Sequence, residues 1–404
     1  ILLFLPMIGF GQGIQYYGNP NTFEIPEYFE QTSDGGYIIL GIIVNDTAAY
    51  NYDGDFADLY LIKVDANLNQ QWAQTYSSNV NYDGYNPHSV QQTSDGGYII
   101  FSSRSDTLYQ TPSGPNLIKT DGNGNIQWEQ LYNNGFIKGA DRTSDGGYVF
   151  VASDSLIKID LSGNIQWIQT VGYGKVSVEQ TTDGGYILGG DHFINCGNYI
   201  PHSLLKTDLN GNTIWTESLP GSGEKRNGCY QTNDGGYISA GHIIFGNGDD
   251  VILVKTDYNG TVLWSQNYSG YYDNSFLGTF YQTSDDGFIL LGGSASGPYA
   301  FETFIKKINS NGVEQWSQNY TDTTLFPRSI RQTNDGGYIM AGIKIHSNND
   351  YDIFLTKTDS LGNLTSSFNI PINANRKLEK TVDILGRESK PQTNQPLLYL
   401  YDDG

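Results

Sequence analysis

Short apolar runs alternate with tight polar turns along most of the chain. The runs at residues 37–40 and 117–119 are rich in β-branched, aromatic and aliphatic side chains and are too short for helices. Gly, Asn and Asp bound these runs, and Asp-Gly is a strong signal for a hairpin turn. No window of about a dozen residues has the period of an amphipathic helix. The pattern therefore predicts an all-β protein built from short antiparallel strands.

Two sequence blocks recur, about 50 residues apart in most copies. The first is Thr-x-Asp-Gly-Gly-Tyr, and its aspartates are Asp34, Asp95, Asp145, Asp183, Asp234, Asp285 and Asp335. The second is Leu-Ile-Lys-x-Asp-x-x-Gly-Asn-x-x-Trp, which is clearest at residues 117–128. Its last position holds every tryptophan of the chain: Trp72, Trp128, Trp167, Trp215, Trp264 and Trp316. The last copy has Ser366 there instead.

These repeats are typical of a β-propeller. A single four-stranded sheet with two apolar faces cannot bury both, whereas sheets stacked around a ring cover one another. We therefore predict a seven-bladed β-propeller of four-stranded antiparallel blades over residues 12–370, with each tryptophan on an outer strand lying across the neighbouring blade. The alternative is a β-helical solenoid, which would need shorter repeats.

The start of this region predicts how the ring closes. Residues 13–18 resemble the outer strand at 264–269, since Gln15 and Tyr17 match Gln266 and Tyr268. Ring closure usually pairs strands from both ends of a chain. We therefore expect residues 13–18 to complete the last blade, whose own outer strand at 361–370 is weak.

The second block resembles the tryptophan-docking motif of quinoprotein-type propellers. The copies at 160–167 and 208–215 fit the spacing of that motif to within one residue. The Thr-x-Asp-x-Gly part of the first block also resembles half of the Asp-box of sialidase propellers. Both likenesses concern the packing of blades and imply no catalytic residue.

Both ends of the chain read as export signals. Residues 1–11 are an apolar run followed by small residues, which is typical of the end of a secretory signal peptide; we expect cleavage before Gln12. A buried strand is the alternative. No Met or basic segment precedes the run, so we expect the sequence to begin inside the signal.

Residues 371–404 differ from the repeats in composition. Residues 377–388 alternate apolar and polar positions around the core 382–388, Val-Asp-Ile-Leu-Gly-Arg-Glu, and an apolar run returns at 397–401. This segment resembles the C-terminal sorting domain of the bacterial type IX secretion system, a small β-sandwich read by outer-membrane export machinery. The usual final strand rich in Lys and Val is absent, so we expect a truncated domain. A generic β-hairpin is the alternative.

That resemblance implies the type IX machinery as a partner and a secreted or outer-surface location in a Gram-negative, Bacteroidetes-like bacterium. Taken whole, residues 14–370 most resemble uncharacterised secreted propellers that carry such sorting domains.

The net charge of the chain limits the kinds of partner that we expect. The 404 residues include 22 Lys and Arg against 43 Asp and Glu, for a net charge of −21. Nucleic-acid backbones and anionic lipids both need a basic surface, so we expect neither partner. The apolar fraction of 38% argues against disorder, and no apolar run is long enough for a membrane span.

The two faces of the predicted ring differ. The fixed turns of both blocks share one face, and loops of variable length share the other, where function is more often found. Tyrosine offers flat apolar area with a polar tip, which suits sugar rings or protein surfaces. The candidate ligand-binding residues on the variable face are Tyr50, Tyr52, Tyr109, Tyr199, Tyr271, Tyr272 and Tyr299. Ordinary loop packing is the alternative for each.

The sequence contains only weak indications of a metal site or a disulfide. His192, Cys196 and His202 match no strong zinc spacing, so we expect no metal. The acidic loop residues Asp53, Asp55, Asp58, Asp249 and Asp250 are the alternative as a Ca²⁺ site, although they lack the full calcium-loop pattern. Cys196 and Cys229 are candidates for a disulfide between neighbouring blades, with two free buried thiols as the alternative.

We therefore expect a monomeric, non-enzymatic binding propeller without a cofactor, which recognises a glycan or a protein on its variable face. The first alternative is an extracellular enzyme, such as a polysaccharide lyase, a glycosidase or a quinone-dependent dehydrogenase. That would need carboxylates, or a His, Tyr and Arg group, converging at the mouth of the ring. The second alternative is a structural spacer.

Overall fold

The computed structural model of the protein describes most of the repeat region and two strands beyond it. The described residues are 14–18, 22–44, 57–77, 83–106, 113–133, 135–172, 174–191, 201–222, 228–245, 248–268, 275–297, 300–320, 322, 324–346, 351–364, 378–383 and 397–401. These residues form strands and no helix. The chain divides into two compact units, Ile14–Thr365 and a smaller one made of Ile1–Gly13 with Ser366–Gly404.

The larger unit is a succession of four-stranded antiparallel sheets. The first three are β2–β5 (Phe23–Gln31, Tyr37–Val44, Asp58–Val64, Gln70–Tyr76), β6–β9 (Asp83–Gln92, Tyr98–Asp106, Gly114–Thr120, Ile126–Leu131) and β10–β13 (Ile137–Arg142, Tyr148–Ala152, Ser155–Ile159, Ile165–Thr170). The next three are β14–β17 (Lys175–Gln180, Tyr186–Asp191, Pro201–Thr207, Thr213–Ser222), β18–β21 (Cys229–Gln231, Tyr237–Phe245, Gly248–Thr256, Val262–Tyr268) and β22–β25 (Ser275–Gln282, Phe288–Gly297, Ala300–Ile308, Glu314–Tyr320). Strands β26–β28 follow (Leu325–Gln332, Tyr338–Ile345, Tyr351–Thr358).

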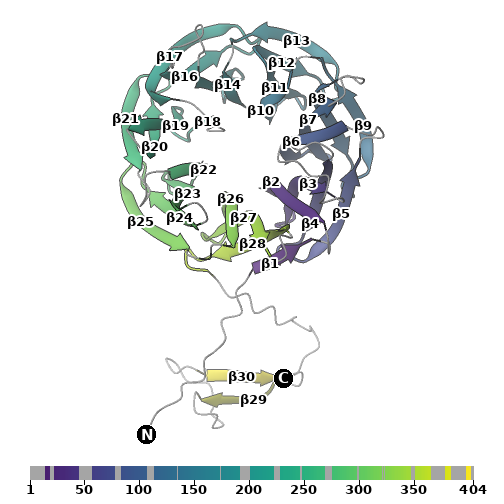
Figure 1. Cartoon of the computed structure of the whole chain (residues 1–404), viewed down its shortest axis with the longest axis vertical. Coiled ribbons are helices and arrows are strands. Elements are labelled where there is room, and N and C mark those ends of the chain that lie inside the picture. The colour runs from purple at the N-terminus through teal and green to yellow at the C-terminus, as the bar shows by residue number, and fades with distance from the viewer. Residues whose placement is uncertain are drawn as a thin grey trace. The chain divides into compact units, whose positions relative to one another are not determined.

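The sheets of this unit stand side by side around a ring (Figure 1). The first strand of each sheet borders the centre, and the fourth strand lies at the outer rim. Two single bridged pairs also link neighbouring sheets, Phe23 with Tyr351 and Ser222 with His242. The predicted all-β architecture of four-stranded antiparallel sheets is confirmed.

The ring closes through its N-terminal strand. β1 (Ile14–Tyr17) pairs antiparallel with β28 and so supplies the fourth strand beside β26–β28, which confirms the predicted closure. The Tyr17 hydroxyl donates to the carbonyl of Leu68 in the first sheet at 2.6 Å. Tyr76, on an ordinary outer strand, donates in the same way to Gly124 of the following sheet.

Each tryptophan packs against the sheet that follows it. Its ring meets edge-on the aromatic residue that ends the following Thr-x-Asp-Gly-Gly block, with centroids 5.7 to 6.3 Å apart. The pairs are Trp72–Tyr98, Trp128–Tyr148, Trp167–Tyr186, Trp215–Tyr237, Trp264–Phe288 and Trp316–Tyr338. A Cβ added to Gly211 would lie 2.6 Å from the Trp167 ring, so this turn glycine also makes room for the indole.

The junction between the last and first sheets is built differently. Lys357 on β28 places its ammonium 5.6 Å from the centre of the Tyr37 ring. The same Nζ donates to the Ala66 carbonyl at 2.8 Å. A cation above an aromatic face is attracted to the electrons of the ring. Lys357 and Tyr17 both contact the first sheet across this seam, and the last copy of the second block has Ser366 at the tryptophan position.

The repeated aspartate ties two strands of its own sheet together. Asp34 accepts hydrogen bonds from Thr32 Oγ1 at 2.5 Å, from the N–H of Gly36 at 3.0 Å and from Lys63 Nζ at 2.8 Å. Lys63 is buried and also donates to the Val64 carbonyl. Burial raises the pKa of Asp34, but the bonds from Lys63 and Thr32 outweigh it and bring the pKa to about 2. The aspartate is thus more than a turn former.

The same lysine–aspartate pair recurs around the ring, with Nζ to carboxylate distances of 2.8 to 3.0 Å. The pairs are Lys63–Asp34, Lys119–Asp95, Lys158–Asp145, Lys206–Asp183, Lys255–Asp234 and Lys307–Asp285. The core lies between sheets, where buried apolar side chains from neighbouring sheets form common clusters.

In the smaller unit, β29 (Leu378–Asp383) pairs antiparallel with β30 (Leu397–Tyr401). These strands fall in the segment predicted to be a sorting domain, which stays a prediction. The predicted signal peptide, residues 1–11, lies outside the described residues.

We expect deletion of residues 12–18 to lower the melting temperature by on the order of 10 °C, because it exposes the edge of β28 and removes the Tyr17 contact. Tyr17→Phe removes only one hydroxyl and should cost about 1 kcal/mol. Thermal melts followed by circular dichroism measure both. An unchanged melt of the deletion variant would show that β1 does not close the ring.

Trp215→Ala should lower the free energy of unfolding by roughly 2–4 kcal/mol, since it removes a ring packed between two sheets. Ile214→Ala is the matched control, because Ile214 is 58% exposed and its loss should change stability by less than about 0.5 kcal/mol. Urea unfolding compares the two variants. Equal losses would contradict the role given to the indole.

Candidate functional site

The tyrosines predicted to bind ligand are not tested by the structure. Tyr50, Tyr52, Tyr109, Tyr199, Tyr271, Tyr272 and Tyr299 all lie outside the described residues. The same is true of Asp53, Asp55, His192 and Cys196. The variable face therefore stays a prediction.

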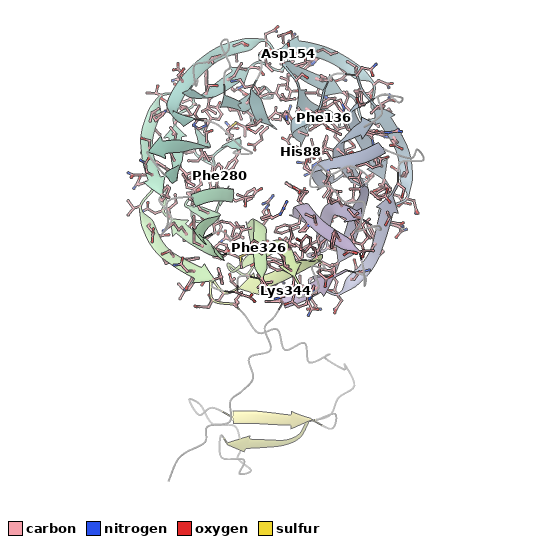
Figure 2. The ribbon with its side chains drawn as sticks, viewed as in Figure 1. His88, Phe136, Asp154, Phe280, Phe326 and Lys344 are labelled. Carbon is pink, nitrogen blue, oxygen red and sulfur yellow. The ribbon has the colours of Figure 1, made fainter. Side chains whose placement is uncertain are left out.

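No three His, Cys, Asp or Glu side chains come together as a metal site within the described ranges. Asp58 on β4 accepts a hydrogen bond from Ser77 at 2.8 Å. His202 is fully buried, with Nε2 against Ser239 Oγ. His88 lies at the inner border of the ring (Figure 2), with Nε2 3.0 Å from the Lys138 carbonyl oxygen.

Cys229 is a free, buried cysteine, so the structure does not form the predicted disulfide with Cys196. Its sulfur packs between two sheets, 3.4 Å from Ser177 Oγ. Burial raises the pKa of this thiol to about 12, which makes it unreactive near neutral pH.

Around the centre of the ring, the inner strands end in a set of equivalent residues directly before the Thr-x-Asp turn. These residues are Gln31, Gln92, Arg142, Gln180, Gln231, Gln282 and Gln332. Glutamines of this set accept a hydrogen bond from the preceding sheet. The donor is the backbone N–H of the residue between the Thr and the Asp of its turn. The bonds run from Ser33 to Gln92, Ser144 to Gln180, Thr182 to Gln231, Asn233 to Gln282 and Ser284 to Gln332, at 2.6 to 3.0 Å.

Arg142 departs from this glutamine ring. A guanidinium carries donors and no acceptor, so Arg142 cannot accept the Ser94 N–H in the way the glutamines accept theirs. Arg142 Nη1 instead donates to the Gln92 carbonyl. Nη2 lies 3.7 Å from Glu30 Oε1, across a side-chain pair that is 43% exposed at the arginine and 23% at the glutamate.

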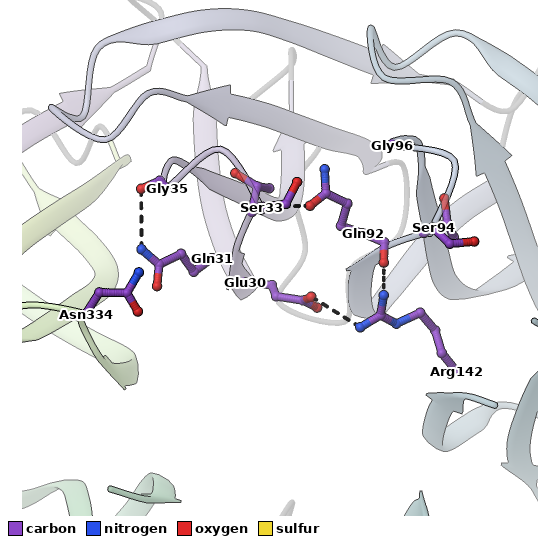
Figure 3. A pocket seen from close by; sticks show the side chains of 11 residues that line it. Glu30, Gln31, Ser33, Gly35, Gln92, Ser94, Gly96, Arg142 and Asn334 are labelled. Atoms are coloured by element: carbon purple, nitrogen blue, oxygen red, sulfur yellow. Dashed lines mark hydrogen bonds and ion pairs between the residues drawn. The ribbon is translucent and has the colours of Figure 1, made fainter. Parts of the chain in front are cut away.

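A cleft of about 550 Å³ lies beside Arg142 (Figure 3). Its lining is polar and comes from four sheets: Glu30, Gln31, Thr32, Ser33, Gly35, Gln92, Thr93, Ser94, Gly96, Arg142 and Asn334. Most of these residues belong to the fixed Thr-x-Asp-Gly-Gly turns. The fixed-turn face thus carries a polar cleft, because a turn repeated around an axis brings its polar groups together there.

One residue before the glutamine ring lies a second set of equivalent positions, which we call the inner belt: Glu30, Gln91, Asp141, Glu179, Tyr230, Tyr281 and Arg331. Its acceptors bind backbone N–H groups of the next sheet. Gln91 accepts from Arg142 at 3.0 Å, Asp141 from Gln180 at 3.0 Å and Glu179 from Gln231 at 2.9 Å.

The carboxyl groups of the inner belt hold protons unusually well. Burial, with the nearby Asp141 charge, raises the pKa of Glu179 to about 8. Burial also raises the pKa of Asp141, against the hydrogen bonds from Gln180 and Gln91. It raises the pKa of Glu30 too, although the charges of Arg142 and Arg331 oppose it.

The other arc of the inner belt is aromatic. The Arg331 guanidinium stacks 3.3 Å from the centre of the Tyr281 ring and lies 5.2 Å from that of Tyr28. Tyr281 in turn stacks on Tyr230. Arg331 Nη1 donates to Ser329 Oγ and to the Ile330 carbonyl. Its Nη2 is buried and has no hydrogen-bond partner within the described part of the chain.

Sequence reasoning missed this site, although a signal was present. Aligning the repeats on their threonine places Arg142 in register with six glutamines. That comparison requires the inner strand to be aligned as well as its turn.

No protein-family model and no curated protein matches the chain. Solved structures do share its fold. A protein of unknown function from Dyadobacter fermentans is 14% identical and aligns over 86% of this chain and 99% of its own, with a TM-score of 0.54. The WD40 domain of Neurospora crassa Pan2 is 10% identical over 87% of this chain and 96% of its own, with a TM-score of 0.50.

The extracellular domain of a B. thetaiotaomicron protein is 11% identical and covers 94% of this chain and 46% of its own, with a TM-score of 0.51. Since WD40 domains are propellers, these likenesses show a β-propeller fold and leave function open. None of the described residues form a helix long and apolar enough to span a bilayer.

We expect stability to fall as pH rises from about 4.5 to 8. Glu179 keeps its proton in the folded state up to a pKa of about 8, whereas the unfolded carboxyl loses it near pH 4.5. Glu179 therefore contributes its full stabilisation of the folded state below the pKa of the unfolded carboxyl. That contribution, at most about 5 kcal/mol, is lost as the pH rises through the pKa of the folded state. Urea unfolding from pH 4.5 to 9 measures it.

Glu179→Gln should flatten this profile, because the amide oxygen still accepts the Gln231 N–H and carries no charge. Glu217→Gln, at an exposed position, is the control and should leave the slope as in the parent protein. A parent profile with no decline in this window would contradict the protonated state of Glu179.

Proposed function

We propose that this chain is the seven-bladed binding propeller of an exported protein, and that it holds a polar, hydroxyl-rich ligand such as a glycan in the cleft on its fixed-turn face. Strands β26–β28 with β1 form the seventh blade of this proposal. The main support for this proposal is Arg142, because it lines the cleft and places a cation at a position where the other repeats have glutamine.

The lining of the cleft suits sugar hydroxyls. The side chains of Gln31 and Asn334 each offer both a donor and an acceptor, and the hydroxyls of Ser33 and Ser94 do the same. The exposed guanidinium of Arg142 adds further donors. A volume of about 550 Å³ lies within the usual range for small-molecule sites.

The tyrosines Tyr50, Tyr52, Tyr109, Tyr199, Tyr271, Tyr272 and Tyr299 are proposed as a second contact surface, for a glycan or a protein, on the variable face. Export rests on the resemblance of residues 1–11 to a signal peptide and of residues 371–404 to a type IX sorting domain. An extracellular neighbour among the solved structures agrees with such a location.

A second candidate function is catalysis. The inner belt brings Glu30, Asp141 and Glu179 toward the ring axis, and burial keeps Glu179 protonated near neutral pH. A carboxylic acid beside a carboxylate is the arrangement that glycosidases use. Asp141 and Glu179 each accept a hydrogen bond from a backbone N–H of the next sheet, which favours a structural role for these two carboxyl groups.

A glycan array followed by calorimetry tests the proposed function. For the glycans that the parent protein binds, we expect Arg142→Gln to lower the affinity at least about tenfold, since it removes the exposed donors of the cleft. The variant restores the glutamine of the other repeats, so its melting temperature should stay the same or rise.

Arg328→Gln is the matched control, because it removes a guanidinium from an inner strand outside the cleft. Unchanged glycan affinity in Arg142→Gln would place the ligand elsewhere. Release of sugar fragments by the parent protein, lost in Glu179→Gln, would favour the enzyme.

A further inference from the structure

The glutamine ring is interrupted at two places, and both interruptions line the cleft. In five repeats, a glutamine Oε1 accepts the backbone N–H of the residue between the Thr and the Asp of the preceding turn. At Ser94 and Asn334, which hold that place in the other two turns, the N–H has no acceptor within the described part of the chain. Arg142 and Gln31 stand at the positions from which those acceptors would come, and they line the cleft together with Ser94 and Asn334 (Figure 3).

An intact position of the ring shows which chemical group this turn N–H binds. Gln180 accepts the Ser144 N–H with Oε1 at 2.6 Å and donates from Nε2 to the Gly184 carbonyl at 3.3 Å. Gln231 makes the same pair of hydrogen bonds. The oxygen of a neutral amide is therefore the ordinary partner of this N–H.

At Ser94 the chain supplies donors where the other repeats supply that oxygen. The Arg142 guanidinium has no acceptor atom, and its Nη1 donates to the Gln92 carbonyl. Its Nη2 lies 3.7 Å from Glu30 Oε1, which is beyond the range of a hydrogen bond. The Ser94 N–H and Arg142 Nη2 are thus two donors of the cleft without an acceptor at hydrogen-bond distance among the described residues.

The charges around the cleft favour a neutral acceptor over an anion. Glu30 already places a negative charge beside Arg142. The backbone N–H of Gln92 also donates to the Glu30 carboxylate and so keeps it in place. The net charge of −21 repels anions from the surface of the chain as a whole.

Building on the proposed function, we propose that the cleft recognises the acetamido group of an N-acetylated sugar. The carbonyl oxygen of this group accepts hydrogen bonds from the Ser94 N–H and from Arg142, in the place that a glutamine oxygen takes in the other repeats. Gln31 uses Nε2 on the Gly35 carbonyl, and its Oε1 is left to accept a ligand N–H or hydroxyl.

Calorimetric titration of the whole chain at pH 7 tests this recognition with N-acetyl-D-glucosamine, D-glucose and D-glucuronate. We expect N-acetyl-D-glucosamine to bind about tenfold more tightly than D-glucose, because its amide oxygen meets two donors that a hydroxyl satisfies less well. D-glucuronate should bind no more tightly than D-glucose. Tighter binding of D-glucuronate than of N-acetyl-D-glucosamine would overturn the choice of a neutral acceptor.

Two substitutions of Arg142 separate the backbone donor from the guanidinium. Arg142→Gln should abolish the preference for the acetamido sugar, because the new glutamine oxygen would itself accept the Ser94 N–H. Arg142→Met removes the guanidinium and offers only a weak sulfur acceptor, so a preference of about threefold should remain. Complete loss of the preference in both variants would overturn the role of the Ser94 N–H.

Ser94→Pro removes the same N–H and leaves Arg142 in place. The Gly96 N–H donates to the Thr93 carbonyl at 3.0 Å, which makes Ser94 the second residue of a tight turn, where proline is favoured. The variant should lower the preference several-fold and keep a cooperative thermal melt.

Ser94→Ala is the matched control, because it removes the hydroxyl and keeps the N–H, and it should bind as the parent protein does. An unchanged preference in Ser94→Pro, or an equal loss in Ser94→Ala, would overturn the acetamido contact.

Two further outcomes distinguish acetamido recognition from the proposed function. Binding of glycans that depends on Arg142, with no preference for the acetamido sugar, would overturn acetamido recognition and keep the cleft as a glycan site. Absence of any Arg142-dependent ligand on the glycan array would overturn both.

Discussion

Each four-stranded sheet of this protein has two apolar faces, and it can cover them only by packing against a sheet on either side. The edge-on contact of an outer-strand tryptophan with the aromatic residue of the next sheet makes this packing specific, because the indole also occupies the space left by a turn glycine. Where the tryptophan is missing, Lys357 and Tyr17 bridge the last and first sheets. The ring depends on this series of contacts, since no single sheet is stable alone.

Nearer the axis, hydrogen bonds replace apolar contacts. The glutamine ring and the inner belt use side-chain oxygens to satisfy backbone N–H groups of neighbouring sheets. Such positions are equivalent by symmetry of the repeat, so a change at one of them alters chemistry without altering the path of the chain. Arg142 is such a change, and the polar cleft lies beside it. Structure and candidate function thus share one set of positions.

Much of the fold could be predicted from the repeats, and less of the candidate site. The four-stranded sheets, the tight turns and closure by residues 13–18 follow from local turn chemistry and from the likeness of Tyr17 to Tyr268. The site was expected among variable loops, whose tyrosines lie outside the described residues. The cleft instead gathers Glu30, Arg142 and Asn334, which are far apart in sequence and meet only because the ring brings its inner strands to one axis.

The sequence by itself determined the strand and turn pattern, the position of each tryptophan and the substitution of Arg142 into a series of glutamines, because these depend on neighbours within one repeat. Only the tertiary structure decided that six of the repeated lysines are buried against their aspartates, that Cys229 is a free thiol between sheets, and that Glu30 lies beside Arg142. The lysine–aspartate pairs depend on how distant strands of one sheet align, and the other two facts depend on how neighbouring sheets pack around the ring. No local pattern of residues encodes these distances.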